Sequence, residues 1–324
     1  LERVNFSKPE IEQVDGLLSY LSRKIDELWG VKLSPGSLDF TRKFLFRKIH
    51  SIDYKVVLYE NFLKRVGARL VIKEEACYGH SISLIKAAKT MGIVTAEYQH
   101  GAISKGHDAY NYSDILRNSA VVRSYLPEYF LGYGKWWNEQ INVPIEKLAI
   151  GNPFRSIAVN NYHRHDFNKI LVLGDGADTE DYISLSIDIS KIAKGKYNVV
   201  FRPHPLEVAY VRERFKVSNT HGILIDSSGS IYDAFFGALV VIGEVSTGLF
   251  EAIGLVDKIF RWDTPKAQFS YPEHPFDTFK DVGELSRKIQ DPRAGRVSLD
   301  SVDEIWAPNW QENYRSFLKQ VGCL

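Results

Sequence analysis

The sequence has little cysteine and no long hydrophobic run, and both features restrict the kind of protein it encodes. Its 324 residues include two cysteines, Cys77 and Cys323, which lie far apart. They form no closely spaced pair of the kind that binds zinc, and this usage favours a reducing compartment. No apolar run approaches the roughly 20 residues that a membrane-spanning helix needs, and no signal peptide is recognisable. We therefore expect a cytoplasmic protein, and leave open a position at the cytoplasmic face of the inner membrane.

The sequence also lacks an excess of charge of either sign. Lysine and arginine total 41 and aspartate and glutamate total 40, a net charge of +1. We therefore expect no nucleic-acid partner. No strand end carries an Asp-x-Asp pair of the kind that holds a divalent metal against a diphosphate, and the histidines show no metal-ligand spacing. We expect neither a metal ion nor another cofactor. The chain begins at Leu1, which is compatible with one module of a longer protein.

Short apolar runs alternate with helical patterns along the whole chain, which predicts an α/β fold with parallel sheets and covering helices. A linker at 160–166 separates two expected domains, 1–150 and 151–324, and the Trp136-Trp137 pair is expected to pack between them. Strands are expected at 68–72, 92–96, 169–173, 197–201, 223–225, 238–242 and 258–261, the last of them closing the series. Helices are expected at 11–28, 40–49, 81–90, 181–193, 230–236, 247–253, 282–289 and 310–321. Ligands bind open α/β sheets at the carboxyl ends of the strands, so we expect the site residues in the segments that directly follow the strands.

The segment after the expected strand 238–242 fits an anion site. Ser246 and Thr247 lie between this strand and the next helix, where hydroxyls and backbone N–H groups converge on a phosphate. Glu251, one helical turn later, is placed to accept hydrogen bonds from a ribose. The same residues also fit an ordinary Ser/Thr helix cap followed by a solvent-facing glutamate.

Two further strand ends in the second half carry candidate donor-binding residues. Arg202 and His204 follow the strand 197–201, and proline on both sides of His204 stiffens the loop. A cation beside a neutral donor suits a phosphate that gains charge as it leaves. Gly174 follows the strand 169–173, in a Gly-Asp-Gly turn that lacks the third glycine of a dinucleotide fingerprint. A tight turn also explains these glycines, and Arg202 also fits a surface position.

The strand end in the first half carries the candidate base. His100 follows the strand 92–96, and an imidazole titrates near neutral pH, so it can take a proton from an acceptor hydroxyl. Asp108 and His107 are placed to orient it, or one of them is itself the base. Glu75, at the end of the strand 68–72, is another candidate base or nucleophile. Each residue also fits an ordinary loop or helix-start hydrogen bond.

Together these motifs resemble the GT-B glycosyltransferases, in which two Rossmann-like domains face each other across a cleft. The resemblance spans roughly residues 68 to 255, and is strongest to the CDP-glycerol glycerophosphotransferase group and to capsule enzymes that use CMP-activated sialic acid or Kdo. Gln99-His-Gly101 resembles a His-Gly motif whose histidine serves as base. Arg202-Pro-His-Pro205 resembles a His-Pro motif that contacts the donor phosphate, and Ser246-Thr247 resembles the Ser/Thr pair that binds it. Glu244 and Glu251 are one residue short of the Glu-x7-Glu spacing of many retaining members.

The resemblance implies a metal-independent glycosyltransferase of bacterial surface-polysaccharide synthesis, with a C-terminal helix that closes back toward the N-terminal domain. The first domain would bind a glycan or glycolipid acceptor, and the second a nucleotide-sugar donor, with CMP-sugars favoured. Peripheral contact with the inner membrane is expected of such an enzyme. Gly151-Asn-Pro153 is similar to a segment of UDP-N-acetylglucosamine 2-epimerases, so a nucleotide-sugar 2-epimerase stays an alternative. A non-catalytic module that binds a glycan or nucleotide is the other.

Overall fold

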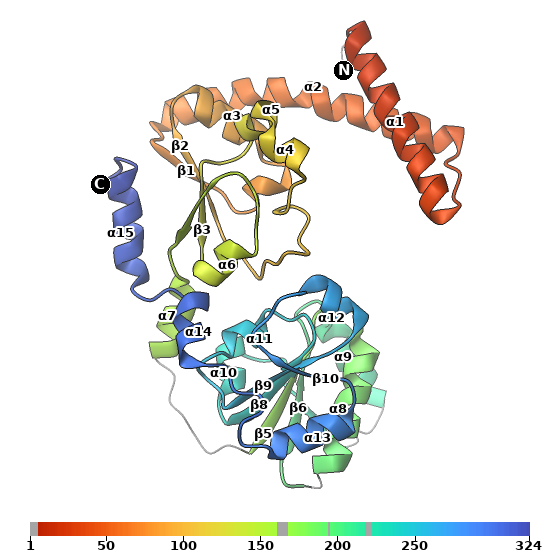
Figure 1. The fold of residues 1–324 in the computed structure, drawn as a ribbon, viewed down its shortest axis with the longest axis vertical. Coiled ribbons are helices and arrows are strands. Elements are labelled where there is room, and N and C mark those ends of the chain that lie inside the picture. Colours follow the sequence, from red (N-terminus) through yellow and green to blue (C-terminus); the bar gives the residue numbers. More distant parts are fainter. Residues whose placement is uncertain (1–5, 161–167, 194, 218–221) are drawn as a thin grey trace.

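The structure, a computed structural model, describes residues 6–160, 168–193, 195–217 and 222–324. It contains two parallel β-sheets, one in each half of the chain, and each sheet is covered by helices (Figure 1). The α/β fold with two parallel sheets is therefore confirmed. All but the first residue of the linker expected at 160–166 lies outside the described residues, as do His163 and His165.

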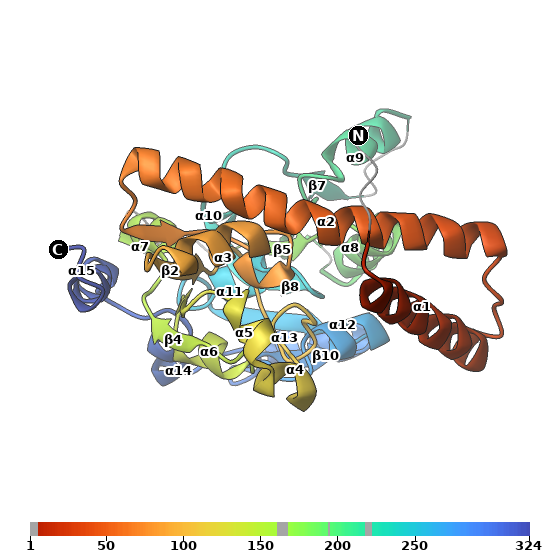
Figure 2. The ribbon, with the colours of Figure 1, turned by 90° about the horizontal axis from the view of Figure 1, so that it is seen from above.

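Two long helices precede the first sheet (Figures 1 and 2). These are α1 (Lys8–Trp29) and α2 (Pro35–Val66). The apolar pattern predicted a helix only at 40–49, but no proline or glycine interrupts residues 37 to 66, so α2 continues until Gly67 adopts the left-handed conformation at φ 62°. Among the described residues, no helix combines the length and hydrophobicity that crossing a membrane requires.

The N-terminal sheet has four parallel strands in the order β1-β2-β3-β4. Their bounds are β1 Leu70–Ile72, β2 Val94–Tyr98, β3 Tyr129–Gly132 and β4 Glu146–Ala149. The connecting helices are η1 (Ala76–Tyr78), α3 (Ile82–Thr90), α4 (Asp114–Asn118), α5 (Ala120–Ser124) and α6 (Lys135–Glu139), and α7 (Pro153–Asn160) follows β4. β2 lies between β1 and β3, so its carboxyl end lies in the interior of the carboxyl edge of the sheet. His100 follows this end of the strand.

The C-terminal sheet has six parallel strands in the order β10-β9-β8-β5-β6-β7. The strands are β5 Lys169–Leu173, β6 Asn198–Arg202, β7 Ile223–Ile225, β8 Ala238–Gly243, β9 Lys258–Trp262 and β10 Asp277–Phe279. The central strands β5 and β8 consist mainly of buried apolar residues, as expected of parallel strands covered on both faces. The prediction that 258–261 is the last strand was wrong, because the short β10 pairs with β9 at the sheet edge.

Helices cover both faces of the C-terminal sheet. One face packs against α8 (Thr179–Ala193), α9 (Val208–Val217) and α13 (Val282–Gln290). The other packs against α10 (Ile231–Phe235) and α11 (Gly248–Glu251). The remaining helices are α12 (Pro265–Ser270), α14 (Leu299–Ile305) and α15 (Trp310–Gln320). The strands β5, β6 and β8 therefore lie in the middle of the layer, and their carboxyl ends open at one edge.

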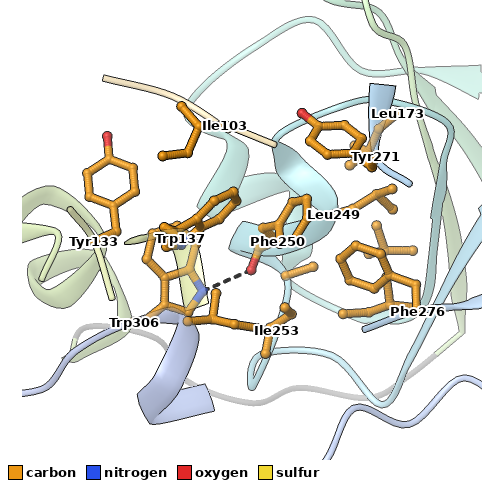
Figure 3. Packing of buried hydrophobic residues seen from close by; sticks show 14 of the residues in the cluster. Ile103, Tyr133, Trp137, Leu173, Leu249, Phe250, Ile253, Tyr271, Phe276 and Trp306 are labelled. Carbon is orange, nitrogen blue, oxygen red and sulfur yellow. Dashed lines mark hydrogen bonds between the residues drawn. The ribbon is translucent and has the colours of Figure 1, made fainter. Parts of the chain in front are cut away.

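An aromatic cluster joins the two domains (Figure 3). Trp137 of α6 is fully buried, with its ring centroid 4.5 Å from that of Phe250 in α11. The indole Nε1 of Trp306, at the end of α14, donates to the Phe250 carbonyl at 3.0 Å. These contacts confirm that the tryptophan pair packs between the domains.

The C-terminal helix returns to the first domain, as the resemblance implied (Figure 1). Phe317 of α15 is buried against Ala96, Leu131 and Ile150 on one face of the N-terminal sheet. The backbone N–H of Ala307 donates to the Tyr133 carbonyl at 2.8 Å and fixes the segment before it. The chain thus crosses between the domains twice.

Candidate functional site

A cavity of about 620 Å³ opens at the carboxyl ends of β5, β6 and β8. We call it the Ser246 cavity. It is lined by all six predicted donor-binding residues, Gly174, Arg202, His204, Ser246, Thr247 and Glu251. A slightly larger hollow of about 750 Å³ lies between α1 and α2, away from any strand end. Since parallel sheets place their ligands at the carboxyl edge, the Ser246 cavity is the stronger candidate.

The loops after β5 and β6 are locked together beneath this cavity. Glu207 is buried, and its carboxylate accepts hydrogen bonds from the backbone N–H of His204 at 2.7 Å and from the Thr179 hydroxyl at 2.5 Å. A Cβ on Gly174 would lie 2.4 Å from the Glu207 carboxylate and 3.1 Å from the His204 nitrogen. Gly174 is therefore required for the close approach of these two loops, whether or not it also faces a ligand.

The His204 imidazole has a defined tautomer. Its Nδ1 accepts a hydrogen bond from the backbone N–H of Leu206 at 3.3 Å. A neutral imidazole has one donor and one acceptor nitrogen, so the proton lies on Nε2. His204 consequently offers an N–H donor from a stiff, proline-flanked loop at the edge of the Ser246 cavity.

Arg202 is committed largely to structure. Its guanidinium pairs with Asp226 at 2.9 Å and donates to the carbonyls of Ser228 and Gly229 at 2.8 and 2.7 Å. Three of its five N–H donors are used in this way. Arg202 therefore holds the segment between β7 and α10 in place while it lines the cavity, and the surface position is wrong because the side chain is mostly buried.

Ser246 and Thr247 follow β8 and face the same cavity. Ser246 Oγ accepts from the Gly248 N–H at 3.3 Å, while Thr247 occupies the N-cap position of α11 without a capping hydrogen bond from its side chain. The Thr247 hydroxyl therefore does not serve as an ordinary helix cap. Among the described residues this hydroxyl remains available to a ligand.

A second cavity, of about 510 Å³, lies beside the first and contains His100. We call it the His100 cavity. Three tyrosines, Tyr98, Tyr133 and Tyr314, form its aromatic walls. Glu251 lines both this cavity and the Ser246 cavity. The candidate base and the candidate phosphate ligands therefore lie in adjoining cavities that meet at Glu251.

Glu251 has an unusual environment for a carboxyl group. Burial raises its pKa to about 7, and the nearby Arg155 guanidinium opposes this shift. Arg155, from α7, is itself buried, and donates to the Ile253 carbonyl at 2.5 Å. A carboxyl group with this pKa holds its proton for part of the time near neutral pH, so it can donate as well as accept a hydrogen bond.

His100 is held in a hydrogen-bonded cluster. The buried Gln99 beside it donates to the Gly101 carbonyl and accepts from the Tyr133 N–H, both at 2.8 Å, which fixes the loop. His100 Nε2 lies 3.4 Å from the Tyr78 hydroxyl and 3.8 Å from a Glu75 oxygen. Glu75 also lies 3.3 Å from His80 Nε2. The structure thus brings Glu75 close to His100, as a neighbour of the imidazole.

Asp108 is linked to His100 only through other residues. Its exposed carboxylate lies 3.8 Å from His107 Nδ1, and His107 Nε2 lies 2.9 Å from the Tyr78 hydroxyl. Burial lowers the pKa of His107, with Asp108 opposing, so this imidazole is neutral at pH 7. Tyr78, which the sequence analysis did not single out, therefore connects the two histidines.

A charged network beside the Ser246 cavity was also missed. The Lys266 ammonium contacts Asp175, Asp178 and Glu244 at 2.8, 2.5 and 2.7 Å. The Tyr182 hydroxyl donates to Asp175 at 2.9 Å. Its members come from four separate segments, so no local sequence pattern could reveal it. It holds the loop after β5, on which Gly174 lies.

Comparison with known proteins shows similarity in structure only. No protein-family model matches the chain, and no curated protein matches its sequence. The UDP-GlcNAc 2-epimerase from Neisseria meningitidis, solved with UDP-GlcNAc, is similar with a TM-score of 0.53 and 11% identity over 82% of this chain and 80% of that one. Acinetobacter baumannii MurG has a TM-score of 0.50 and 9% identity, over 82% and 77%.

The pneumococcal O-GlcNAc transferase GtfA, solved with UDP and GlcNAc, also has a TM-score of 0.50, with 13% identity over 81% of this chain and 59% of that one. At such identities the likeness establishes the fold alone. The chain therefore has the GT-B fold, a scaffold that glycosyltransferases and UDP-GlcNAc 2-epimerases share.

Proposed function

We propose that the protein is a cytoplasmic glycosyltransferase that moves a sugar from a nucleotide-activated donor to a growing cell-surface polysaccharide or glycolipid. The observation that carries this proposal is the meeting of two cavities at Glu251, one lined by His204, Ser246 and Thr247 and the other by His100. Two reactants held in adjoining cavities react as if at very high local concentration. A CMP-activated sugar is the favoured donor, on the resemblance of the sequence motifs.

The Ser246 cavity would bind the phosphate of the donor. The Nε2–H of His204 and the hydroxyls of Ser246 and Thr247 would donate to its oxygens. When the bond between the sugar carbon and the phosphate oxygen breaks, the electron pair stays with the phosphate, and fixed donors stabilise the added charge. The proposed reaction assigns this stabilisation to side chains, so EDTA should leave turnover unchanged.

In the His100 cavity, His100 would take the proton from the acceptor hydroxyl as that oxygen attacks the sugar. The contacts support one consistent proton arrangement. Tyr78 donates to His107 Nε2 and accepts from His100 Nε2–H, which leaves His100 Nδ1 free to accept the proton. The tyrosine walls would stack against a sugar ring.

The proposal is tested by transfer of label from CMP-activated sialic acid or Kdo to a polysaccharide or glycolipid fraction. His100→Ala and His204→Ala should each lower turnover at least about tenfold, since a positioned base or oxyanion donor typically contributes a factor of 10² or more. The exposed His50 provides a matched control, and His50→Ala should turn over like the wild type. Wild-type turnover in either site variant would remove that residue from its role.

The nucleotide is tested separately by thermal shift with CMP, CDP, UDP and GDP. A bound nucleotide stabilises the folded state by about 2.7 kcal/mol at a concentration of 100 times its Kd. We expect the largest rise in melting temperature with CMP, and Ser246→Ala with Thr247→Ala should abolish it. An equal or larger rise with UDP would reject the CMP-sugar assignment while leaving the transferase proposal in place.

A nucleotide-sugar 2-epimerase is the second candidate, because the similarity to the Neisseria enzyme covers 82% of this chain. An epimerase needs no acceptor. Incubation with UDP-GlcNAc alone, followed by NMR, would show a second hexosamine configuration if this candidate is right. An unchanged UDP-GlcNAc spectrum together with acceptor-dependent loss of a CMP-sugar would exclude it.

A further inference from the structure

We propose that the outward face of α2 binds the surface of a membrane that contains anionic lipids. Helix α2 runs along the end of the molecule that is farthest from the C-terminal domain (Figures 1 and 2). Its buried side, which includes Val56 and Leu63, packs against α3. The side turned away from this core combines large exposed apolar side chains with basic residues, and a helix that faces only water does not need such apolar side chains.

Large apolar side chains lie along that outward side in two groups, 40–44 and 54–62, at steps of four residues within each group and with basic residues beside and between the groups. We call this set the α2 stripe. It consists of Phe40, Phe44, Arg47, Lys48, Tyr54, Lys55, Leu58, Phe62 and Arg65. At 100° per residue these positions fall within about a third of the helix circumference. The five apolar members are between 47% and 72% exposed. An exposed apolar surface of this extent indicates a binding site.

The charge of the α2 stripe indicates an anionic partner. All four of its charged residues are basic, and none of the four makes an ion pair within the part of the chain that the structure describes. The three acidic residues of α2, Asp39, Asp53 and Glu60, lie on another side of the helix. Lys48 and Arg65 lie over the rings of Phe44 and Phe62, at 5.4 and 6.0 Å. Cations and aromatic rings side by side suit the headgroup region of an anionic bilayer.

A second copy of the chain fits this surface less well. An isologous pair would place the same stripe against itself, and antiparallel pairing about position 51 would set Arg47 against Lys55 of the other copy. Like charges brought together in an apolar interface are unfavourable. An anionic lipid surface instead complements every charge of the stripe, and it would leave the N-terminal domain, with the His100 cavity, nearer to the bilayer than the Ser246 cavity.

The test is co-sedimentation of the full chain with phosphatidylcholine vesicles that contain no anionic lipid or about one third phosphatidylglycerol. We expect binding only to the anionic vesicles, weakened by salt. Lys48→Gln with Lys55→Gln should lower the partition coefficient at least about tenfold, because each lysine near an anionic surface contributes roughly a factor of five. The matched control is Lys43→Gln with Lys64→Gln, two exposed lysines of the same helix outside the stripe, which should change binding far less.

Phe44→Ser with Leu58→Ser supplies the independent apolar test, and these exposed positions should leave the fold intact by circular dichroism. Binding should fall several-fold if the rings enter the headgroup region. Salt-sensitive binding that this variant leaves unchanged would show a general polyanion surface and overturn the bilayer assignment. Equal losses of vesicle binding in the two double-lysine variants would also overturn the assignment. A third contradicting result would be a wild-type protein that binds no vesicles but forms a dimer by light scattering, with the apolar variant monomeric. The assay measures no turnover, so its result is independent of the proposed function.

Discussion

At the scale of single residues, the structure gives His100 a partner that its sequence neighbours do not supply. The Tyr78 hydroxyl lies between His100 Nε2 and His107 Nε2, at 3.4 and 2.9 Å. Burial raises the pKa of Tyr78, so its hydroxyl stays protonated at neutral pH. A tyrosine in this position can hold the His100 ring with one nitrogen free to act as base.

Tyr78→Phe removes this hydroxyl and keeps the ring. We expect kcat to fall roughly tenfold, a part of the 10²–10⁴ that a positioned base contributes, with an unchanged KM for the donor and a shifted acidic limb of the pH–rate profile. Tyr112→Phe is the control, because that hydroxyl donates to the Cys77 carbonyl and contacts neither histidine. An unshifted pH profile with wild-type kcat would exclude Tyr78 as a positioning residue.

Glu251 makes stability depend on pH in a defined direction. Its pKa of about 7 in the folded protein lies above the usual 4.5, so the folded state binds the proton more tightly than the unfolded state. Stability from this group is complete below pH 4.5, is lost as the pH rises to 7, and stays lost above it. Between pH 5 and 8 the wild type should therefore lose roughly 1–3 kcal/mol relative to Glu251→Gln.

Urea denaturation of both proteins at the two pH values measures this difference, and all other titrating groups cancel in the comparison. A constant difference across the range would show that Glu251 ionises at its ordinary pKa. The substitution also changes contacts directly, including the one with the nearby Arg155. This effect shifts the stability difference equally at both pH values, so only the change of that difference with pH reports the pKa of Glu251.

The sequence was sufficient to predict the site residues that directly follow strands, but not the residues that contact them from other elements. His100, His204, Ser246 and Thr247 could be named because strand ends meet at one sheet edge, and the structure brings the last three together. Tyr78 and Arg155 could not, because each reaches the site from a different helix through tertiary packing. The catalytic and binding roles themselves stay predictions.

At the scale of elements, strands that carry an apolar run were predictable, including β1 and β7 at two sheet edges, whereas the edge strands β4 and β10 and the interior strand β3 were not. β5, β6 and β8 each contain an apolar run, at 170–173, 199–201 and 238–242, because neighbours cover them on all sides. β4 and β10 lie at sheet edges, and β4 begins with exposed Glu146 and Lys147. An edge strand pairs on one side only, so its sequence need not be hydrophobic. β3, of four residues, is too short to show a period.

The loops after β5 and β6 act as one unit, and Gly174→Ala should disturb it. The added Cβ would meet the Glu207 carboxylate at 2.4 Å, so the His204 loop must move. We expect a loss of about 1–3 kcal/mol in the free energy of unfolding and a weaker response to the stabilising nucleotide in thermal shift. Gly16→Ala in α1 is the control, since nothing lies within 4 Å of its added Cβ, and it should stabilise by up to about 1 kcal/mol. Unchanged stability in Gly174→Ala would mean that the two loops are not locked.

At the scale of the whole molecule, apolar packing rather than charge sets how the domains sit. Trp137, Phe250 and Trp306 are buried at the junction, whereas the ion pair of Lys105 with Glu273 is exposed and contributes little. The sequence pattern indicated two domains, and its resemblance to GT-B enzymes implied a returning helix. It could not indicate which surfaces meet, because apolar residues of the junction have the same pattern as those of each core.

The returning helix α15 should stabilise the N-terminal domain specifically. Phe317→Ala leaves a cavity against Ala96, Leu131 and Ile150, which should cost about 3 kcal/mol or more. In native-state hydrogen exchange, amides of β2 and β3 should lose protection, while those of β5 and β8 keep theirs. Leu324→Ala, at a 70% exposed position, should change neither. Because the residues of the Ser246 cavity lie in the other domain, nucleotide binding should survive Phe317→Ala. Equal loss of protection in both sheets would instead mean that the two domains unfold as one cooperative unit, held together through the Trp137–Phe250 contact.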